Sequence, residues 1–507
     1  MIGRMRASLP VAQSPADYNA ARTAWADFAA AAGPTLHAFD VALKAPRDAQ
    51  RECLRRILRA NAATQFGLVH DFASITSIEA WQARVPVCSW AELAPQVERI
   101  KAGEAGVLTA EAPIHFERTS GSGAQHKDIP YTPALMREFQ SALVVWLAAL
   151  LRDCPDVAGP CYWALSPDRQ LPQVTPSGAT VGSASDALYL TGSPAERLLP
   201  SVVAVDVGDD SDWPTKTMSR LVIEDELRLV SVWSPTFLLS LLDADPALPE
   251  RSDLSQLWPN LALISCWTDG PSAAFARQLA GLFPNTRIAP KGLFATEGVV
   301  STSYGLSSLR PVAITSHFLE FVDSSGTARI VNELEEGDCY ELLLTTSGGL
   351  YRYRLGDQVR VTGFIDATPC LEFVGRVDAR SDLVGEKIDQ AIVSQALLAA
   401  GVPAGAVLVP DASASPARYR LVTETADASA ADAVERELGR VHHYRIARAN
   451  QQLDAVHLHV VASTAALLHE AWQATGRRSG DVKAAALITS AQFAAAIVRL
   501  LDAGDRT

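Results

Sequence analysis

The chain has 507 residues, of which 48% are hydrophobic and 20% are charged. These are ordinary globular values, and they exclude a disordered chain, a collagen-like chain and a small disulfide scaffold. The 44 Lys and Arg residues against 57 Asp and Glu residues give a formal net charge of −13, which argues against a dedicated nucleic-acid or anionic-membrane binder. The length allows roughly three domains, or one large and one small domain.

Targeting signals are weak. The longest apolar run, near residues 142–151, is about half the roughly 20 residues that a membrane span needs, so no span is predicted. The N-terminus has two arginines but no apolar stretch behind them, which argues against a secretory signal. Seven scattered cysteines without a CxxC pair suggest neither a disulfide framework nor a zinc site. We expect a cytoplasmic protein.

Hydrophobic periodicity predicts an α/β fold. Helices are expected near residues 20–31, 48–62, 133–151 and 234–242, and short buried strands at 227–232 and 262–266. A β-rich stretch follows, with strands expected at 317–322, 340–346, 350–355 and 358–361. The fold class is therefore a large N-terminal domain with mixed sheets and a β-rich subdomain, followed by a small C-terminal α/β domain.

The C-terminal part reads as a separate small unit. Helices are expected at 388–400, 430–442 and 490–503, and strands at 406–409, 419–423 and 456–461. We place the boundary between residues 376 and 382, which gives an N-terminal domain at 1–378 and a C-terminal domain at 379–507.

A Ser/Thr/Gly loop between Phe116 and Lys127 has the composition of a phosphate cradle. Glycines let backbone N–H groups approach phosphate oxygens, and hydroxyls add donors. The loop residues are Thr119, Ser120, Gly121, Ser122 and Gly123. The pattern is not the Walker P-loop, and a turn without a ligand is the alternative interpretation. Lys127 is either a phosphate contact or a solvated lysine.

Two further motifs carry carboxylates. In Thr296-Glu297-Gly298 the glutamate has a surface turn as its alternative interpretation. In the run 349–357, strand alternation puts Tyr351 and Tyr353 on one face of the strand. Arg352 and Arg354 are expected on the opposite face. Asp357 is expected just past a glycine at the strand end, where a carboxylate can accept hydrogen bonds from two ribose hydroxyls. An amphipathic hairpin with a turn aspartate is the alternative.

The order of these motifs, with Gly375-Arg376 and a late Gly-x-x-Lys loop at Lys483, resembles the adenylate-forming ligases. More closely, the chain resembles the acyl acid amido synthetase family, which includes the auxin- and jasmonate-conjugating enzymes of plants. The most specific stretch is Leu350-Tyr-Arg-Tyr-Arg-Leu-Gly-Asp357 through Val361-Thr-Gly-Phe364. Matching stretches also lie at 64–67, 85–87, 129–130 and 258–261.

The resemblance implies that ATP activates a carboxylic acid as an acyl-adenylate, and that an amine, usually of an amino acid, then forms an amide. It implies the following roles: Thr119, Ser120 and Ser122 at the β- and γ-phosphates, Thr296 near the α-phosphate, Glu297 as a Mg²⁺ ligand, Asp357 at the ribose, and Arg376 at ribose or phosphate. Lys387 and Lys483 compete for the catalytic role on the transition-state charge. Leu293 stands where relatives stack an aromatic ring on adenine, so Phe294 is the candidate for that contact.

Several alternatives stay open from the sequence. The acyl pocket is expected among the helix 139–151, Tyr162-Trp163 and residues 175–185, although apolar residues such as Trp146 are more often core than pocket residues. An acyl-CoA ligase and a catalytically silent acyl or nucleotide binder are the rival functions. The expected partners are a small-molecule acid and an amine, with no nucleic acid and no membrane. The oligomeric state is open, and a monomer is compatible with the sequence.

Overall fold

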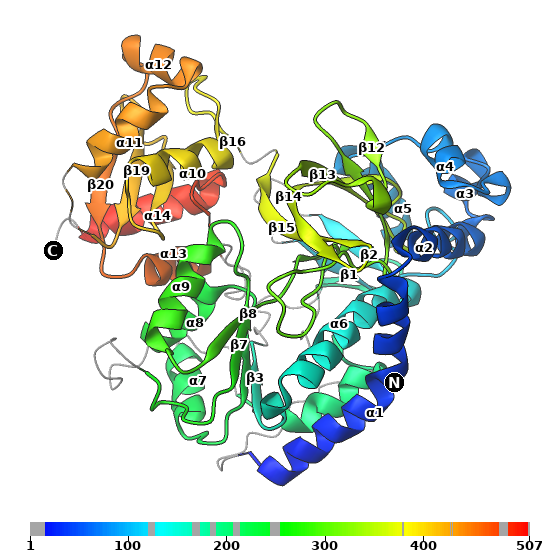
Figure 1. Ribbon diagram of the computed structural model, residues 1–507. Helices are drawn as coiled ribbons and strands as arrows, with labels where there is room; N and C mark the ends of the chain where they lie inside the picture. The colour runs from blue at the N-terminus through cyan, green and yellow to red at the C-terminus, as the bar shows by residue number, and fades with distance from the viewer. Residues whose placement is uncertain are drawn as a thin grey trace.

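The computed structural model describes residues 16–119, 127–164, 173–182, 189–205, 213–243, 254–377, 380–425, 427, 429–475 and 485–504. The described residues form a mixed α/β fold with several separate sheets (Figure 1). Four short 3-10 helices connect larger elements: η2 (Phe72–Ser74), η3 (Pro155–Val157), η5 (Pro194–Ser201) and η6 (Val331–Glu333).

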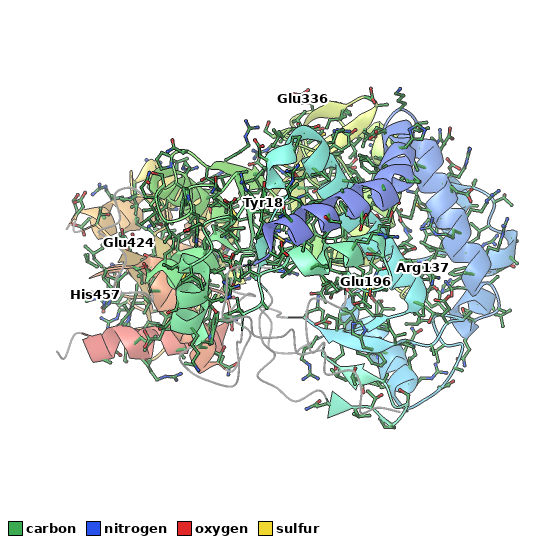
Figure 2. The ribbon with its side chains drawn as sticks, turned by 90° about the horizontal axis from the view of Figure 1, so that it is seen from below. Tyr18, Arg137, Glu196, Glu336, Glu424 and His457 are labelled. Carbon is green, nitrogen blue, oxygen red and sulfur yellow. The ribbon has the colours of Figure 1, made fainter. Side chains whose placement is uncertain are left out.

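Five helices open the fold: α1 (Tyr18–Ala42), α2 (Pro46–Asn61), α3 (Gln65–Val69), α4 (Ile78–Arg84) and α5 (Trp90–Lys101). Side chains at their N-termini satisfy backbone N–H groups that a helix leaves unpaired. Asp17 caps α1, Thr64 caps α3 and Ser77 caps α4. Ser89 and Glu92 form a capping box on α5. Helix α1 runs across the outside of the molecule, with Tyr18 at its start (Figure 2).

A parallel sheet forms the centre of the fold, with strand order β3 (Cys161–Trp163), β6 (Leu229–Ser231), β7 (Leu263–Cys266) and β8 (Arg287–Pro290). Successive side chains of a strand point to opposite faces. Leu229 and Leu263 therefore pack with α1 and α6 (Pro133–Asp153). Val230 and Ile264 pack on the other face, where α7 (Trp213–Val222), α8 (Pro235–Asp243) and α9 (Ser272–Leu282) lie (Figure 1).

Helix α6 is the core helix of this layer. It is long and apolar enough to cross a membrane by length and composition, and it is longer than the apolar run that the sequence analysis considered. However, 78% of its apolar window is buried inside the protein. Its hydrophobicity is thus accounted for by packing, as expected for a helix that is apolar on most sides.

The remaining N-terminal sheets are built from antiparallel pairs, with one exception. One sheet has the order β2 (Asp128–Tyr131), β1 (His115–Arg118), β5 (Thr180–Val181), β4 (Gln173–Val174), and the hairpin β9 (Phe294–Ala295) with β10 (Gly298–Val299) stands alone. The exception is β1 with β5, which pair in parallel. The five-stranded sheet has the order β12 (Ala328–Arg329), β11 (Phe318–Val322), β13 (Cys339–Thr345), β14 (Tyr353–Ile365), β15 (Thr368–Arg376).

The expectation that Asp357 follows a strand end is wrong. Strand β14 continues through Gly356 and Asp357, and Asp357 is paired in register with Arg376 of β15. Gly356 has a φ of +84°, a left-handed conformation that glycine adopts without a steric penalty. The strand therefore bends at this glycine and keeps its pairing instead of ending.

The C-terminal elements lie together on one side of the molecule (Figures 1 and 2). They are β16 (Arg380–Ser381), β17 (Ile388–Asp389), α10 (Gln390–Ala399), β18 (Val407–Asp411), β19 (Arg418–Thr423), α11 (Ala430–Leu438), α12 (His442–Ala449), β20 (His457–Val460), α13 (Thr464–Ala474) and α14 (Ala491–Gly504). The prediction of a single helix at 430–442 is wrong. Helix α11 ends at Leu438, with Gly439 as its C-cap, and helix α12 begins at His442.

Helix α13 was not expected from the sequence, and it joins the two parts of the chain. Ala465 belongs to the same hydrophobic cluster as Phe237 of α8. The Ser463 hydroxyl donates a hydrogen bond to Asp243 Oδ2 over 2.8 Å. The ring of His469 lies 5.9 Å from that of Phe237, and burial lowers the pKa of this imidazole to about 3. A neutral histidine thus packs in an apolar contact.

Candidate active site

Two cavities open at the carboxyl end of the central parallel sheet. One is lined by the segments that follow β7 and β8, and the other by the segments that follow β3 and β6. Ligands of open α/β sheets bind at this edge, outside the carboxyl ends of the strands. We call them the polar cleft and the aromatic pocket.

The polar cleft has a volume of about 700 Å³. Its lining combines the β7 and β8 segments with the end of the β14–β15 hairpin, and it includes Trp267, Thr268, Asp269, Lys291, Leu293, Phe294, Arg310, Asp357, Phe373 and Arg376. Arg310 Nη2 lies 2.9 Å from Asp269 Oδ1, so this pair of opposite charges belongs to the wall of the cleft.

Asp357 and Arg376 face the cleft from neighbouring strands. Arg376 Nε lies 3.6 Å from Asp357 Oδ1, and Arg376 Nη2 donates to the carbonyl of Leu355 over 3.0 Å. Asp357 is 7% exposed. The β-register brings these two predicted site residues together, and it leaves a carboxylate in the cleft that can accept hydrogen bonds from vicinal hydroxyls.

A second polar group joins Lys127, Tyr353 and Glu297. The Lys127 ammonium donates to the Tyr353 hydroxyl over 2.7 Å and lies 3.6 Å from Glu297 Oε1. Burial, reinforced by the nearby Glu297 carboxylate, raises the pKa of Tyr353, and Arg376 opposes this shift. Lys127 is thus held by its neighbours and is not a freely solvated lysine. The expected strand alternation does not extend to Tyr351 and Arg352, because β14 begins at Tyr353 and Arg352 has a φ of +46°. The sequence analysis gave Tyr353 no part in the site.

The turn of the β9–β10 hairpin carries Thr296 and Glu297. The Thr296 carbonyl accepts a hydrogen bond from Tyr131 over 2.7 Å. Glu297 is 7% exposed, so the alternative of an exposed surface turn is wrong. A buried carboxylate needs a compensating partner, which Lys127 supplies.

Part of the expected phosphate loop can be placed. Thr119 is buried at the end of β1, and its N–H donates to the Lys127 carbonyl over 2.9 Å. This bond brings the two ends of the loop together. Ser120, Gly121, Ser122 and Gly123 lie outside the described residues.

Phe294 contributes to the polar cleft, but its side chain is 7% exposed. Its ring packs against Phe139, Trp146 and Trp233 with centroid distances of 5.7, 6.4 and 5.8 Å. The ring is therefore part of the wall between the two cavities. Stacking of Phe294 on adenine stays a prediction.

The aromatic pocket has a volume of about 470 Å³. Its lining is Phe139, Leu143, Trp146, Trp163, Ala164, Tyr189, Leu190, Ser231, Val232, Trp233 and Lys291. The sequence analysis expected helix α6 and Trp163 to line an acyl pocket, and both contribute to the wall of this cavity. Residues 175, 176 and 181 instead line a different cavity beside Arg118 and Asp128, and residues 183–185 are not among the described residues.

Lys291 lines both cavities and was missed by the sequence analysis. It follows β8, and its ammonium crosses to β6, where it donates to Ser231 Oγ over 2.7 Å. The ammonium lies 4.2 Å from the Trp146 ring centroid and 4.9 Å from that of Trp233. A Cβ at the next residue, Gly292, would meet the Ser301 carbonyl oxygen at 2.5 Å, and Gly292 has a φ of +91°. No short motif marks this lysine in the sequence.

The predicted catalytic Lys387 lines neither cavity. Lys387 is exposed and has a φ of +48°. The buried Glu386 carboxylate fixes the turn before it by accepting the N–H groups of Leu383 and Val384. Lys483 lies outside the described residues. The catalytic roles of both lysines stay predictions.

The donors present fit a nucleotide and, in part, a metal. Asp357, Arg376 and Lys127 offer a hydroxyl acceptor and two cations. In the part of the chain that the structure describes, no group of three or more His, Cys, Asp or Glu side chains could hold a metal ion. Glu297 is therefore not part of such a group among the described residues, which suits Mg²⁺ because this ion is usually bound by one or two carboxylates together with phosphates and waters.

Comparisons with solved structures show the fold. The GH3.15 acyl acid amido synthetase in complex with 2,4-DB superposes with a TM-score of 0.77 at 17% identity, over 92% of this chain and 95% of that one. A 2-hydroxyisobutyryl-CoA ligase in the postadenylation state, in complex with 2-HIB-AMP, gives a TM-score of 0.56 at 13% identity over 90% and 91%. The fold is thus that of an acyl acid amido synthetase and, more distantly, of an acyl-CoA ligase.

Sequence comparisons define the family. GH3 family domains match three successive parts of the chain: the N-terminal domain at 35–244, the central domain at 311–376 and the C-terminal domain at 386–492. The chain belongs to the GH3 family.

Two curated relatives agree with this assignment. The probable indole-3-acetic acid-amido synthetase GH3.12 of Oryza sativa subsp. japonica is 24% identical over 437 residues, 68% of this chain and 70% of that protein. The jasmonoyl-L-amino acid synthetase JAR6 of Nicotiana attenuata is 23% identical over 400 residues, 64% and 68% of the two chains. The fold class, the family and the amide-forming ligase class that the sequence predicts are confirmed.

Proposed function

We propose that this enzyme couples a carboxylic acid to an amine, which is expected to be that of an amino acid, at the expense of ATP. In the first half-reaction a carboxylate oxygen bonds to the α-phosphorus, and the bond from that phosphorus to the bridging oxygen breaks, so pyrophosphate leaves. In the second, the amine nitrogen bonds to the acyl carbon, the bond to AMP breaks and the amine loses a proton. The observation that carries this proposal is that a polar cleft and an aromatic pocket meet at one sheet edge.

The polar cleft is the proposed ATP site. Asp357 accepts hydrogen bonds from the ribose hydroxyls, and Arg376 holds ribose or phosphate beside it. Thr119, Ser120 and Ser122, with the N–H groups of Gly121 and Gly123, hold the β- and γ-phosphates, and Lys127 adds charge at the base of that loop. Thr296 contacts the α-phosphate region. The 3.6 Å pair of Asp357 with Arg376, and the position of Lys127 next to the loop, support these roles.

Glu297 is the proposed protein ligand of Mg²⁺. When bound with the nucleotide, the ion would neutralise charge on the phosphates and on leaving pyrophosphate. In the absence of the ion, Lys127 compensates the buried Glu297 carboxylate. Lys483 or Lys387, in the proposed C-terminal domain at 379–507, is the candidate for the remaining charge on the α-phosphoryl group.

The aromatic pocket is the proposed acyl site. Three tryptophans, a tyrosine and a phenylalanine are five of its eleven lining residues, and aromatic walls give a large apolar contact with a defined shape. A flat or apolar acyl body fits this lining better than a polar one.

A cytoplasmic location is part of the proposal. All seven cysteines are free thiols, and five of them are buried. Such thiols are compatible with a reducing compartment.

ATP–pyrophosphate exchange with Mg²⁺ tests the first half-reaction, using benzoate, phenylacetate, indole-3-acetate and dodecanoate as the acid panel. We expect exchange that depends on one class of acid, followed by amide formation when amino acids are added. Thioester formation with CoA in place of the amide would overturn the proposed acceptor. ATP binding without exchange on any acid would overturn the proposed reaction.

A further inference from the structure

Lys291 occupies the point where the two cavities meet. Lys291 follows β8 and is part of the wall of both cavities. On the side of the aromatic pocket its ammonium is bonded to Ser231. In the adenylation step the acid must place its carboxylate against the α-phosphate of ATP. If the acyl body lies in the aromatic pocket and the nucleotide in the polar cleft, the carboxylate has to pass this junction.

The ammonium is buried without a negatively charged partner among the described residues. Lys291 is 2% exposed, and its polar contact is the neutral hydroxyl of Ser231. The Trp146 and Trp233 rings supply weaker cation–π attraction from within 5 Å. A buried cation with one neutral acceptor is costly. An anion that binds beside the ammonium would supply the missing negative charge, so we expect this position to favour anion binding.

We propose that Lys291 positions the carboxylate of the acyl substrate at the junction of the aromatic pocket and the polar cleft. This inference rests on the proposed function and assigns a residue to its acid-recognition step. The ammonium holds one carboxylate oxygen, and the other oxygen stays directed at the α-phosphorus. Lys291 transfers no proton and forms no covalent bond.

The surroundings distinguish this role from simple core packing. The groups that face the ammonium are Ser231 and Trp233 from the β6 segment, Trp146 from α6 and Cys266 from β7. Tyr189 lines the same pocket. Burial raises the pKa of the Cys266 thiol to about 12, so this thiol is protonated and is no counter-ion at neutral pH. The charged groups Asp269, Arg310, Asp357 and Arg376 belong to the polar cleft. Burial also lowers the pKa of Lys291 to about 7, as expected for an uncompensated ammonium.

The test uses the full-length enzyme and the panel acid that gives the fastest exchange. The variants are Lys291→Met, which keeps the length of the side chain without its charge, and Lys291→Arg, which keeps the charge. Lys44→Met is the matched control, because Lys44 is exposed at the end of α1 and away from both cavities. We expect Lys291→Met to raise the KM for the acid at least tenfold and to change the KM for ATP less than twofold. Lys291→Arg should recover part of the loss.

A binding measurement provides the second readout. Titration of the ATP-free enzyme with the acid and with its primary amide compares a charged and a neutral form of one acyl body. The wild-type enzyme should prefer the acid at pH 6.5, and Lys291→Met should lose that preference while still binding the amide. Equal preference in both proteins would overturn the inference.

The outcomes separate the two proposals. Exchange that persists in Lys291→Met with an unchanged KM for the acid overturns the inference and leaves the proposed function standing. A large fall in kcat with unchanged KM for the acid also overturns it, because Lys291 would then act on the transition state. No exchange by the wild-type enzyme with any acid overturns the proposed function, and this inference with it.

Discussion

The polar cleft and the aromatic pocket lie at the same sheet edge but are built in different ways. The key polar residues of the cleft, Asp357 and Arg376, belong to one hairpin whose register places them opposite each other. The wall of the pocket comes from α6 and from the ends of β3 and β6, with few residues from each. Where a polar site depends on strand register, its residues lie in short sequence motifs. Where an apolar site depends on shape, its residues come from distant parts of the sequence.

The first prediction tests whether every polar residue of the 349–357 motif serves nucleotide binding, or whether some of them stabilise the fold. Arg352 is buried, pairs with Glu320 at 3.0 Å and donates to the carbonyls of Gln82 and Val85. Arg352→Ala leaves the Glu320 carboxylate without its cation, which should cost about 3–5 kcal/mol of stability. A lower midpoint of thermal unfolding by circular dichroism checks this.

Arg354→Ala is the matched control, because its side chain is 53% exposed two residues further on. Its unfolding midpoint should match the wild-type value within error. Equal destabilisation by both variants would contradict a structural role specific to Arg352.

The second prediction concerns the carboxylate of the cleft. Asp357→Ala removes an acceptor of two ribose hydrogen bonds, and each charged bond is worth about 1.5–3 kcal/mol. The loss of even one such bond corresponds to about 10- to 100-fold, so the KM for ATP in the exchange assay should rise at least about tenfold, with the KM for the acid nearly unchanged. A selective rise in the KM for the acid would show that the two cavities are assigned the wrong way round.

The third prediction is a pH dependence confined to the acyl side. The protonated form of Lys291 binds the carboxylate, and its pKa in the free enzyme is about 7. As pH rises through this value, the charged fraction falls and the KM for the acid should rise by about tenfold per pH unit. The KM for ATP should not follow this profile. Lys291→Arg provides the comparison, since arginine stays protonated over the whole range, and its profile should be flat.

The smallest expected effect concerns Trp163. Its indole N–H is buried and has no hydrogen-bond partner within the described part of the chain, and the residue lines the aromatic pocket. Trp163→Phe removes this donor and keeps a ring, so discrimination between 4-methoxybenzoate and 4-ethylbenzoate should change by about fivefold, the worth of one hydrogen bond of roughly 1 kcal/mol. Trp90→Phe, outside both cavities, should leave the ratio of the two kcat/KM values unchanged.

The same contrast explains what the sequence could predict. The helix of residues 133–151, two of the four strands of the central sheet (β6 and β7) and the family follow from periodicity and from the 350–364 stretch, whereas β3 and β8 were not predicted. The junction at Lys291 does not, because it depends on a side chain that crosses from β8 to β6, and strand order cannot be read from spacing. Asp357 lines the polar cleft, and its role there stays a prediction. Its expected local structure was wrong, since Gly356 suggests a strand end as readily as a bend within a strand.

The packing of α13 on α8 has a consequence for protein engineering. A cut after residue 378 would remove Ala465 and His469 from an apolar surface that includes Phe237, and such a fragment would expose that surface to solvent and favour aggregation. Chimeras that exchange C-terminal regions between relatives would need α8 and α13 from the same parent. His469 is neutral in this contact because burial lowers its pKa to about 3, so a replacement on α8 that adds charge would change the protonation or the packing of this histidine.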